Sequence, residues 1–233
     1  MFNHVKNDYD AFNSTFKLVI KSLLYIAIAL VCVLLYGLIQ VTVHYAMQYS
    51  YLLTKSKYVT VIIGLALIMF ANYLIIIPVR KNSDPLNKIN QLKTINFIIE
   101  AVVLLIIARI SLMIIFFINS DNFNTSNQVA LNHMFHSNIV GHYYIVLLSI
   151  ALAPFIEEFI FRWLPYKIIK NKFWAFLLGL IGFIFLHSPN SLISFVIYAI
   201  IGLILEIMFY HHGYYGSSFL HCLYNLTSVI LVI

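Results

Sequence analysis

The sequence predicts an all-α membrane protein, a bundle of about seven transmembrane helices (six to eight). Hydrophobic residues make up 62% of the 233 residues, and charged residues only 9%. Soluble domains carry about a quarter charged residues, and a soluble fold of this size needs more charges to cover its surface. The apolar stretches are also about 20 residues long, the length that crosses a bilayer. Lipid is therefore the solvent that fits this composition.

Seven apolar stretches follow one another along the chain. The first three are expected to span the membrane at residues 22–44, 59–79 and 95–118. Pro78 marks the end of the second, because proline interrupts helical hydrogen bonding. The last four are expected at residues 140–166, 173–187, 192–210 and 214–233. We therefore expect an N-terminal three-span region, residues 1–139, and a core, residues 140–233, within one integral membrane unit.

The positions of lysine and arginine predict the orientation. With the N-terminus in the cytosol, the outer segments hold only Lys55 and Lys57. The cytosolic segments then hold ten basic residues: Lys6, Lys17, Lys21, Arg80, Lys81, Lys88, Lys93, Lys167, Lys170 and Lys172. This bias predicts a cytosolic N-terminus and, for seven spans, an outer C-terminus. The net charge of +6 thus indicates membrane orientation, with no nucleic-acid signature, and the residue usage suggests a bacterial plasma membrane.

Two minor features carry little functional information. Cys32 and Cys222 lie inside apolar stretches, where we expect them to be small buried side chains. His133, His136 and His142 cluster near the outer loop. A metal site there is one interpretation, but their irregular spacing favours a hydrated loop.

Ionisable residues inside the predicted spans are the main functional candidates, because each costs several kcal/mol in lipid unless it is paired or faces a cavity. They are Glu100, Arg109, Glu157, Glu158, Arg162 and Glu206. Glu206 and Arg109 could pair across helices or support a transport path. Three of the charges, Glu157, Glu158 and Arg162, lie within six residues of one another in the span 140–166. Packing alone does not readily explain such a concentration of charge.

The spacing of these three charges predicts their arrangement. Glu158 and Arg162 are four residues apart, so they share a helix face and can form an ion pair. Glu157 points about 100° away around the helix. Pro154 lies one turn before it and should kink or loosen the helix. The pattern predicts one neutralised carboxylate and one available for chemistry; the alternative is an ion pair that only locks helix packing.

Two later helices add polar side chains. His187 ends the span 173–187, while His221 and Asn225 are four residues apart and share a face of the last span. The pair indicates either a lined cavity or interhelical hydrogen bonding. At about 1.5 Å per residue, Glu157, His221 and His187 lie roughly 15, 13 and 21 Å from the inner ends of their helices. Three helices could therefore place these side chains at one level.

Three motifs in the C-terminal half resemble those of a known family. They are EEFIFR (Glu157 to Arg162), FIFLH (Phe183 to His187) and HCLYN (His221 to Asn225). In this order they resemble the EExxxR, FxxxH and HxxxN motifs of the CPBP family, the CAAX-prenyl-protease and bacteriocin-processing (Abi) membrane peptidases. The resemblance covers about residues 140–233. It implies a helical bundle with a polar cavity reached from the cytosol, and cleavage of peptide bonds near the membrane surface.

The resemblance also implies a role for each matched residue. Glu157 would be the general base, and His187 would help it to hold the attacking water. His221 and Asn225 would stabilise the oxyanion. The supporting pair would be Glu158 and Arg162. A divalent metal such as zinc could instead bind Glu157, His187 and His221, although the HExxH zinc signature is absent. The sequence leaves open whether the enzyme is a metalloprotease or a glutamic-type peptidase.

The sequence therefore predicts an intramembrane endopeptidase. Its substrate would be a small peptide or a membrane-associated protein, prenylated or not, and its role could be bacteriocin self-immunity or peptide processing. The alternative is a membrane protein that confers immunity or binds peptides without catalysis. A transporter is a third hypothesis.

Overall fold

The computed structural model describes residues 2–48, 54–80, 86, 88, 92, 94–118 and 146–232. These residues form helices, turns and bends and contain no strand, which confirms the predicted all-α class. The histidines His133, His136 and His142 lie outside the described residues. The main helices are α1 (Phe2–Gln48), α2 (Thr54–Val79), α3 (Ile95–Ile118), α8 (Lys172–Leu186) and α9 (Leu192–Val232).

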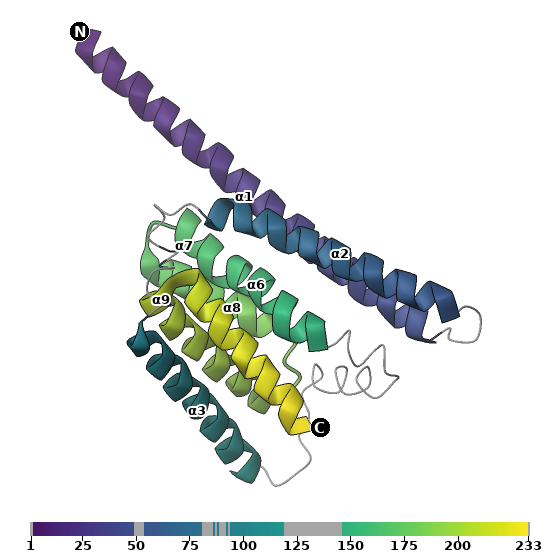
Figure 1. The fold of residues 1–233 in the computed structure, drawn as a ribbon. Helices are drawn as coiled ribbons and strands as arrows, with labels where there is room; N and C mark the ends of the chain where they lie inside the picture. Colours follow the sequence, from purple (N-terminus) through teal and green to yellow (C-terminus); the bar gives the residue numbers. More distant parts are fainter. Residues whose placement is uncertain are drawn as a thin grey trace.

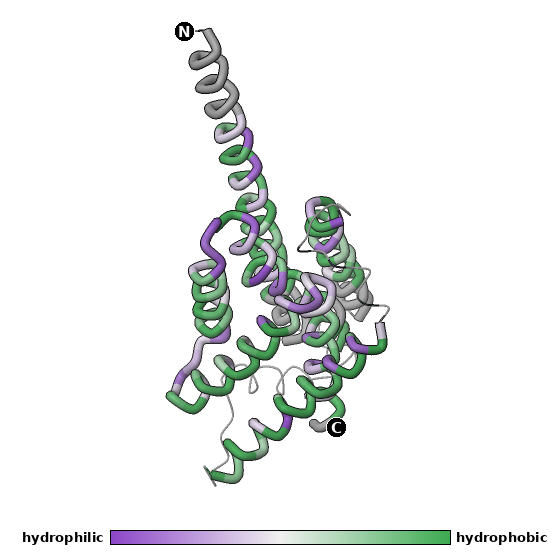
Figure 2. The backbone as a smooth tube through the Cα atoms, turned by 90° about the vertical axis from the view of Figure 1, so that its left-hand side faces the viewer, coloured by the Kyte–Doolittle hydropathy of each residue, from purple (hydrophilic) through white to green (hydrophobic). Residues whose placement is uncertain are grey.

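Four of the described helices are long and apolar enough to cross a membrane. The stretches are Ser14–Ile39, Ile62–Val79, Ile95–Ile118 and Leu192–Ile230. Figure 2 shows hydrophobic residues along the length of the helices, with hydrophilic residues mostly at ends and turns. Large apolar side chains such as Ile98, Met113 and Phe117 are exposed on α3, where contact with lipid would be favourable. The chain is an integral membrane protein; its span count of seven stays a prediction.

The first helix is longer than the span predicted at residues 22–44. Helix α1 has 47 residues, about 70 Å, whereas the hydrocarbon core of a bilayer is about 30 Å thick. No proline interrupts the polar segment before the apolar stretch, so the helix continues through it. Figure 1 shows the first part of α1 extending away from the other helices, while α2 runs back along its second half.

The helix that carries the two adjacent glutamates alternates between two geometries. It begins with the π turn η2 (Leu148–Leu152), continues as α6 (Ala153–Glu158), and then forms the π turn η3 (Phe159–Trp163) and α7 (Leu164–Ile168). Pro154 lies in the first turn of α6, directly after η2, where the sequence predicts a loosened helix. Each π turn holds an extra residue, and such turns are frequent at functional sites.

Helix α8 is bounded by local signals in the sequence. At its start, Asn171 caps the helix by accepting a hydrogen bond from the backbone N–H of Phe173, 2.9 Å away. At its end, Ser188 adopts a left-handed conformation with φ 47°, as residues beyond a helix C-terminus often do. Pro189 cannot continue the helix. These signals place His187 at the helix end, where its side chain can leave the helix surface.

Helix α9 reverses direction at Gly213, which has φ 70° and ψ −166°. This backbone conformation is essentially restricted to glycine. The break gives two limbs of about 20 residues, each long enough to cross a bilayer. They correspond to the predicted spans 192–210 and 214–233. Figure 1 shows the second limb running back beside the first.

The segment between α2 and α3 satisfies the backbone groups that the reversal leaves free. Lys88 Nζ donates to the carbonyl oxygens of Tyr210 and His211, at 2.5 and 3.1 Å. The backbone N–H of Tyr214 donates to the carbonyl oxygen of Leu86, 2.9 Å away. Since unpaired backbone groups are costly away from water, these contacts stabilise the turn.

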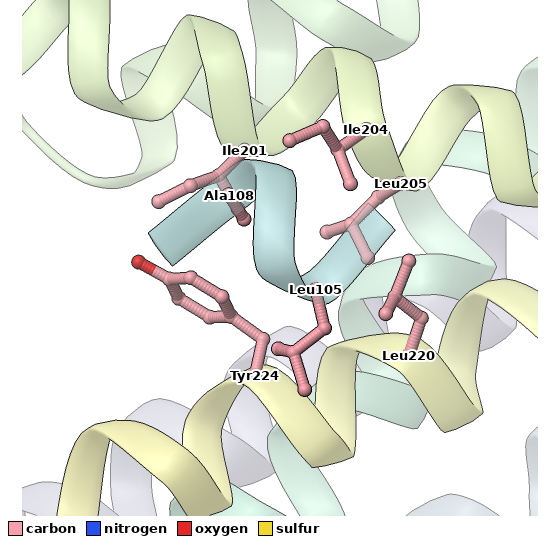
Figure 3. A pocket seen from close by; sticks show the side chains of 7 residues that line it. All are labelled: Leu105, Ala108, Ile201, Ile204, Leu205, Leu220 and Tyr224. Carbon is pink, nitrogen blue, oxygen red and sulfur yellow. The ribbon is translucent and has the colours of Figure 1, made fainter. Parts of the chain in front are cut away.

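Helix α3 packs against both limbs of α9. Figure 3 shows Leu105 of α3 between the two limbs, facing Leu205 and Leu220. The cavity that these apolar side chains line holds about 10 Å³, which is at most the room that one water needs. It is therefore a packing defect in the core and does not suit a ligand. Glu100 of α3 also binds the histidines at the reversal, with its Oε2 2.9 Å from His212 Nε2.

Helix α8 approaches the π turn η3 closely because residue 179 is glycine. A Cβ atom at Gly179 would lie 2.0 Å from the carbonyl oxygen of Phe161 and 3.1 Å from Glu206 Oε1. The first distance is far below van der Waals contact, so α8 would have to move. The absence of a side chain at this position thus allows the helices of the C-terminal half to meet.

We predict that Gly179→Ala lowers the free energy of unfolding by about 1–3 kcal/mol, the usual cost of overpacking. Thermal unfolding of the purified protein in detergent would measure the change. Gly37→Ala on α1 is the matched control, because a Cβ there meets nothing within 4 Å. Equal melting temperatures for both variants would contradict the close approach.

Candidate functional site

Three helices bring Glu157, His187 and His221 together. The sequence predicts that these side chains lie at similar depths in the membrane. The Nε2 atoms of His187 and His221 lie 4.0 and 3.8 Å from Glu157 Oε2. These atoms are too far apart to hydrogen-bond with one another. Glu157 Oε2 is also buried without a hydrogen-bond partner among the described residues. The site thus holds a buried carboxylate oxygen that faces two imidazole nitrogens without a hydrogen bond to either.

The second glutamate has a separate set of partners. Glu158 Oε1 lies 3.0 Å from Arg162 Nη1, which forms the ion pair that their spacing predicts. The same oxygen lies 2.9 Å from His221 Nδ1. Since a carboxylate accepts and does not donate, His221 Nδ1 carries a proton, and Nε2 is the atom that faces Glu157. Glu158 therefore fixes the orientation of the imidazole that Glu157 meets.

Exposure separates the roles of the two adjacent glutamates. The side chains of Glu158 and Arg162 are 0% exposed, whereas those of Glu157 and His187 are each 14% exposed. A substrate or solvent molecule can reach only the second pair. This difference in exposure agrees with the predicted arrangement of one neutralised and one available carboxylate, while the catalytic role of Glu157 stays a prediction.

The ring of His187 is held by three contacts. Its Nδ1 lies 2.9 Å from the carbonyl oxygen of Phe183, one turn earlier in α8. Its ring stacks on Tyr198 of α9, with centroids 4.4 Å apart and planes at 28°. The Phe183 ring lies 4.6 Å away on centroids. Because Nδ1 faces a carbonyl, Nε2 is directed at Glu157. The sequence contained no signal for Tyr198, because its role depends on how α9 packs.

Asn225 contacts a different element from the histidines. Its Nδ2 donates to the carbonyl oxygen of Ser149, 2.7 Å away in η2. Ser149 lies about two turns before Glu157 in the same run of helical elements, η2 and α6. One amide hydrogen of Asn225 is therefore used to join α9 to η2, and the second remains for another acceptor. The oxyanion role of Asn225 stays a prediction.

The pairing considered between Glu206 and Arg109 is wrong. Arg109 binds neutral groups of the second limb of α9: Nε donates to Thr227 Oγ1 at 3.1 Å, and Nη2 donates to Ser228 Oγ at 2.8 Å. Its guanidinium also lies over the Tyr224 ring, 4.3 Å from the centroid. Glu206 lies instead beside Arg162, with Oε1 3.7 Å from Nε. The rotation of each helix about its axis decides which partner each charge meets. The spacing of residues in the sequence does not predict this rotation.

The metal site considered for Glu157, His187 and His221 also stays a prediction. Carboxylate and imidazole ligands suit zinc chemically. Within the described part of the chain, however, no group of three or more His, Cys, Asp or Glu side chains is arranged to hold a metal ion.

Comparison with known proteins bears on the same region. Residues 139–227 match the family model described as type II CAAX prenyl endopeptidase Rce1-like. This match includes all three motifs of the site. No solved structure matches the chain.

Two proteins of Lactococcus lactis subsp. lactis (strain IL1403) are similar to the chain. The UPF0177 protein YvdC is 30% identical over 112 residues, which are 47% of this chain and 42% of the relative. The UPF0177 protein YaiH is 28% identical over 134 residues, 55% and 56% of the two chains. The chain thus spans about half the length of the curated relatives that it matches. Over residues 139–227 the chain is therefore similar to the Rce1-like type II CAAX prenyl endopeptidases, in line with the resemblance of its three motifs to the CPBP family.

Proposed function

We propose that the protein is an intramembrane endopeptidase that hydrolyses a peptide bond with a water activated by Glu157. The observation that carries this proposal is the buried Glu157 Oε2, which lacks a hydrogen bond and faces two imidazole nitrogens at 3.8 and 4.0 Å. One water between them would have partners on three sides. The family match of the same residues supports a peptidase.

In the proposed reaction, Glu157 takes a proton from the water as the oxygen attacks the peptide carbonyl carbon. His187 holds the water's second hydrogen through Nε2. Glu157 then gives its proton to the departing amine nitrogen, so that the carboxylate returns to its starting state. The 14% exposure of Glu157 and His187 supports access of a peptide to this face of the site.

Negative charge develops on the carbonyl oxygen during the attack and needs hydrogen-bond donors. We assign this role to His221 and Asn225. His221 would donate from Nε2 in its imidazolium form, whose charge Glu158 would balance from 2.9 Å away. Asn225 would use the amide hydrogen that does not bind Ser149. Glu158 in turn needs Arg162, because an uncompensated buried carboxylate is strongly destabilising.

The substrate would be a small peptide or a membrane-associated protein in the lipid bilayer. A bacterial plasma membrane with the N-terminus in the cytosol is the location that the charge bias favours. Bacteriocin self-immunity or peptide processing is the proposed biological role. Immunity by binding alone is the alternative.

We predict that Glu157→Gln lowers kcat for peptide cleavage at least 100-fold, because glutamine has the size of glutamate but cannot take the proton. Cleavage of a quenched fluorescent peptide by the protein in proteoliposomes would measure it. Glu100→Gln is the matched control: Glu100 lies in α3 and binds His211 and His212, and this variant should stay within twofold of wild type. Full activity in the Glu157 variant would refute the base assignment.

A second prediction concerns immunity. If cleavage confers protection, cells that express Glu157→Gln should become as sensitive to the cognate bacteriocin as cells without the protein. Growth inhibition at graded bacteriocin concentrations would measure this, with membrane levels of the variant checked on immunoblots. Retained protection with no cleavage would instead favour the binding function.

The proposed route uses only carboxylate, imidazole and amide groups, so it predicts that dialysis against a chelator leaves the cleavage rate within twofold. The same fluorescent peptide assay, with and without added zinc, would test this. Activity that disappears on chelation and returns with zinc would show that the three residues act as metal ligands.

A further inference from the structure

Arg162 has a second carboxylate partner that lies outside the three motifs. Its Nη1 binds Glu158, but its Nε lies 3.7 Å from Glu206 Oε1 on the first limb of α9. Its Nη2 donates to the carbonyl oxygen of Gly202 at 3.2 Å. Gly202 and Glu206 are four residues apart and so share one face of this limb. The first limb of α9 thus supplies two of the groups that surround the guanidinium.

The surroundings of Glu206 keep its carboxylate at Arg162. The residue is only 3% exposed. Tyr166 of α7 donates to Glu206 Oε2 at 3.3 Å. Helix α8 contributes Gly179, where a Cβ atom would lie 3.1 Å from Glu206 Oε1. Glycine at this position therefore leaves room for a carboxylate in the protein interior.

Charge attraction, and not a hydrogen bond, joins Glu206 to Arg162. Glu206 Oε1 and Arg162 Nε are both buried without a hydrogen-bond partner among the described residues. Two opposite charges 3.7 Å apart attract strongly where water is excluded. Arg162 is further confined by the Phe183 ring, whose centroid lies 4.3 Å from Cζ. The guanidinium is thus held from four sides, and Glu158 is only one of them.

We propose that Glu206 is a positioning residue for the peptidase site. It holds the guanidinium of Arg162 in the orientation in which Nη1 meets Glu158, and Glu158 then orients His221 toward Glu157. The proposal rests on the proposed function for its effect on catalysis. The chain of contacts from Glu206 to His221 is a separate physical claim that can be tested without activity.

Two variants of Glu206 separate its charge from its size. Glu206→Gln keeps the shape but removes the attraction, so Arg162 and then His221 should lose their fixed orientation. Because small misplacements at a reacting centre are costly, we expect kcat to fall about tenfold while KM stays within twofold. Glu206→Asp keeps the charge and should recover at least half of the lost kcat. Peptide cleavage in proteoliposomes would give both constants.

A spectroscopic measurement follows His221 itself. In the protein labelled with ¹⁵N-histidine in detergent, the Nδ1–H of His221 should give a downfield proton resonance, because it binds a buried carboxylate. A Glu158→Gln spectrum would assign it. We expect this resonance to shift or broaden in Glu206→Gln and to persist in Glu206→Asp. Glu100→Gln, the matched control, should leave both kcat and the resonance unchanged.

The outcomes distinguish this proposal from the proposed function. Wild-type kcat and an unchanged His221 resonance in Glu206→Gln would overturn the positioning role, even if Glu157→Gln is inactive. An equal loss of kcat in the Gln and Asp variants would overturn it as well. If the wild-type protein cleaves no peptide, the peptidase proposal fails, but a resonance that changes in Glu206→Gln and persists in Glu206→Asp and Glu100→Gln would still support the positioning role.

Discussion

The arrangement of the site depends on one buried cation. Arg162 is fully buried, and an isolated guanidinium inside a membrane protein would be highly unfavourable. It is stable there because two carboxylates, a backbone carbonyl and an aromatic ring surround it. These partners come from its own helix, from α8 and from the first limb of α9. The positive charge of Arg162 is therefore neutralised only when its own helix, α8 and the first limb of α9 pack together. The same packing places the histidines beside Glu157.

The sequence predicted features whose cause is local. Helix α3 begins at Ile95 and ends at Ile118, as predicted, because polar residues bound a stretch in which apolar residues predominate. The ion pair of Glu158 and Arg162 followed from helical spacing. Features that depend on tertiary packing were missed. Glu206 meets Arg162 and not Arg109 because of how the helices are rotated about their axes, and a single sequence does not encode that rotation in any simple pattern.

The N-terminal region contributes to the C-terminal half in ways that no motif indicates. Lys88 and Leu86 precede the family match, yet they bind the reversal of α9. Tyr25 of α1 packs edge-on against Trp163, with ring centroids 5.1 Å apart. The reversal in turn starts the limb that carries His221, and Tyr214 ties its beginning to the carbonyl oxygen of Phe155 at 3.0 Å.

The π turns η2 and η3 allow one helix to contact several neighbouring helices with different faces. An unbroken α-helix presents a single face to each partner along its whole length. Each extra residue in η2 and η3 rotates the next part of the helix by about 100°. Ser149 can therefore meet Asn225, Glu157 the histidines, and Trp163 helix α1, although all three belong to one continuous rod. Removing a single residue from either wide turn would rotate the later contacts out of alignment while leaving the helix itself intact.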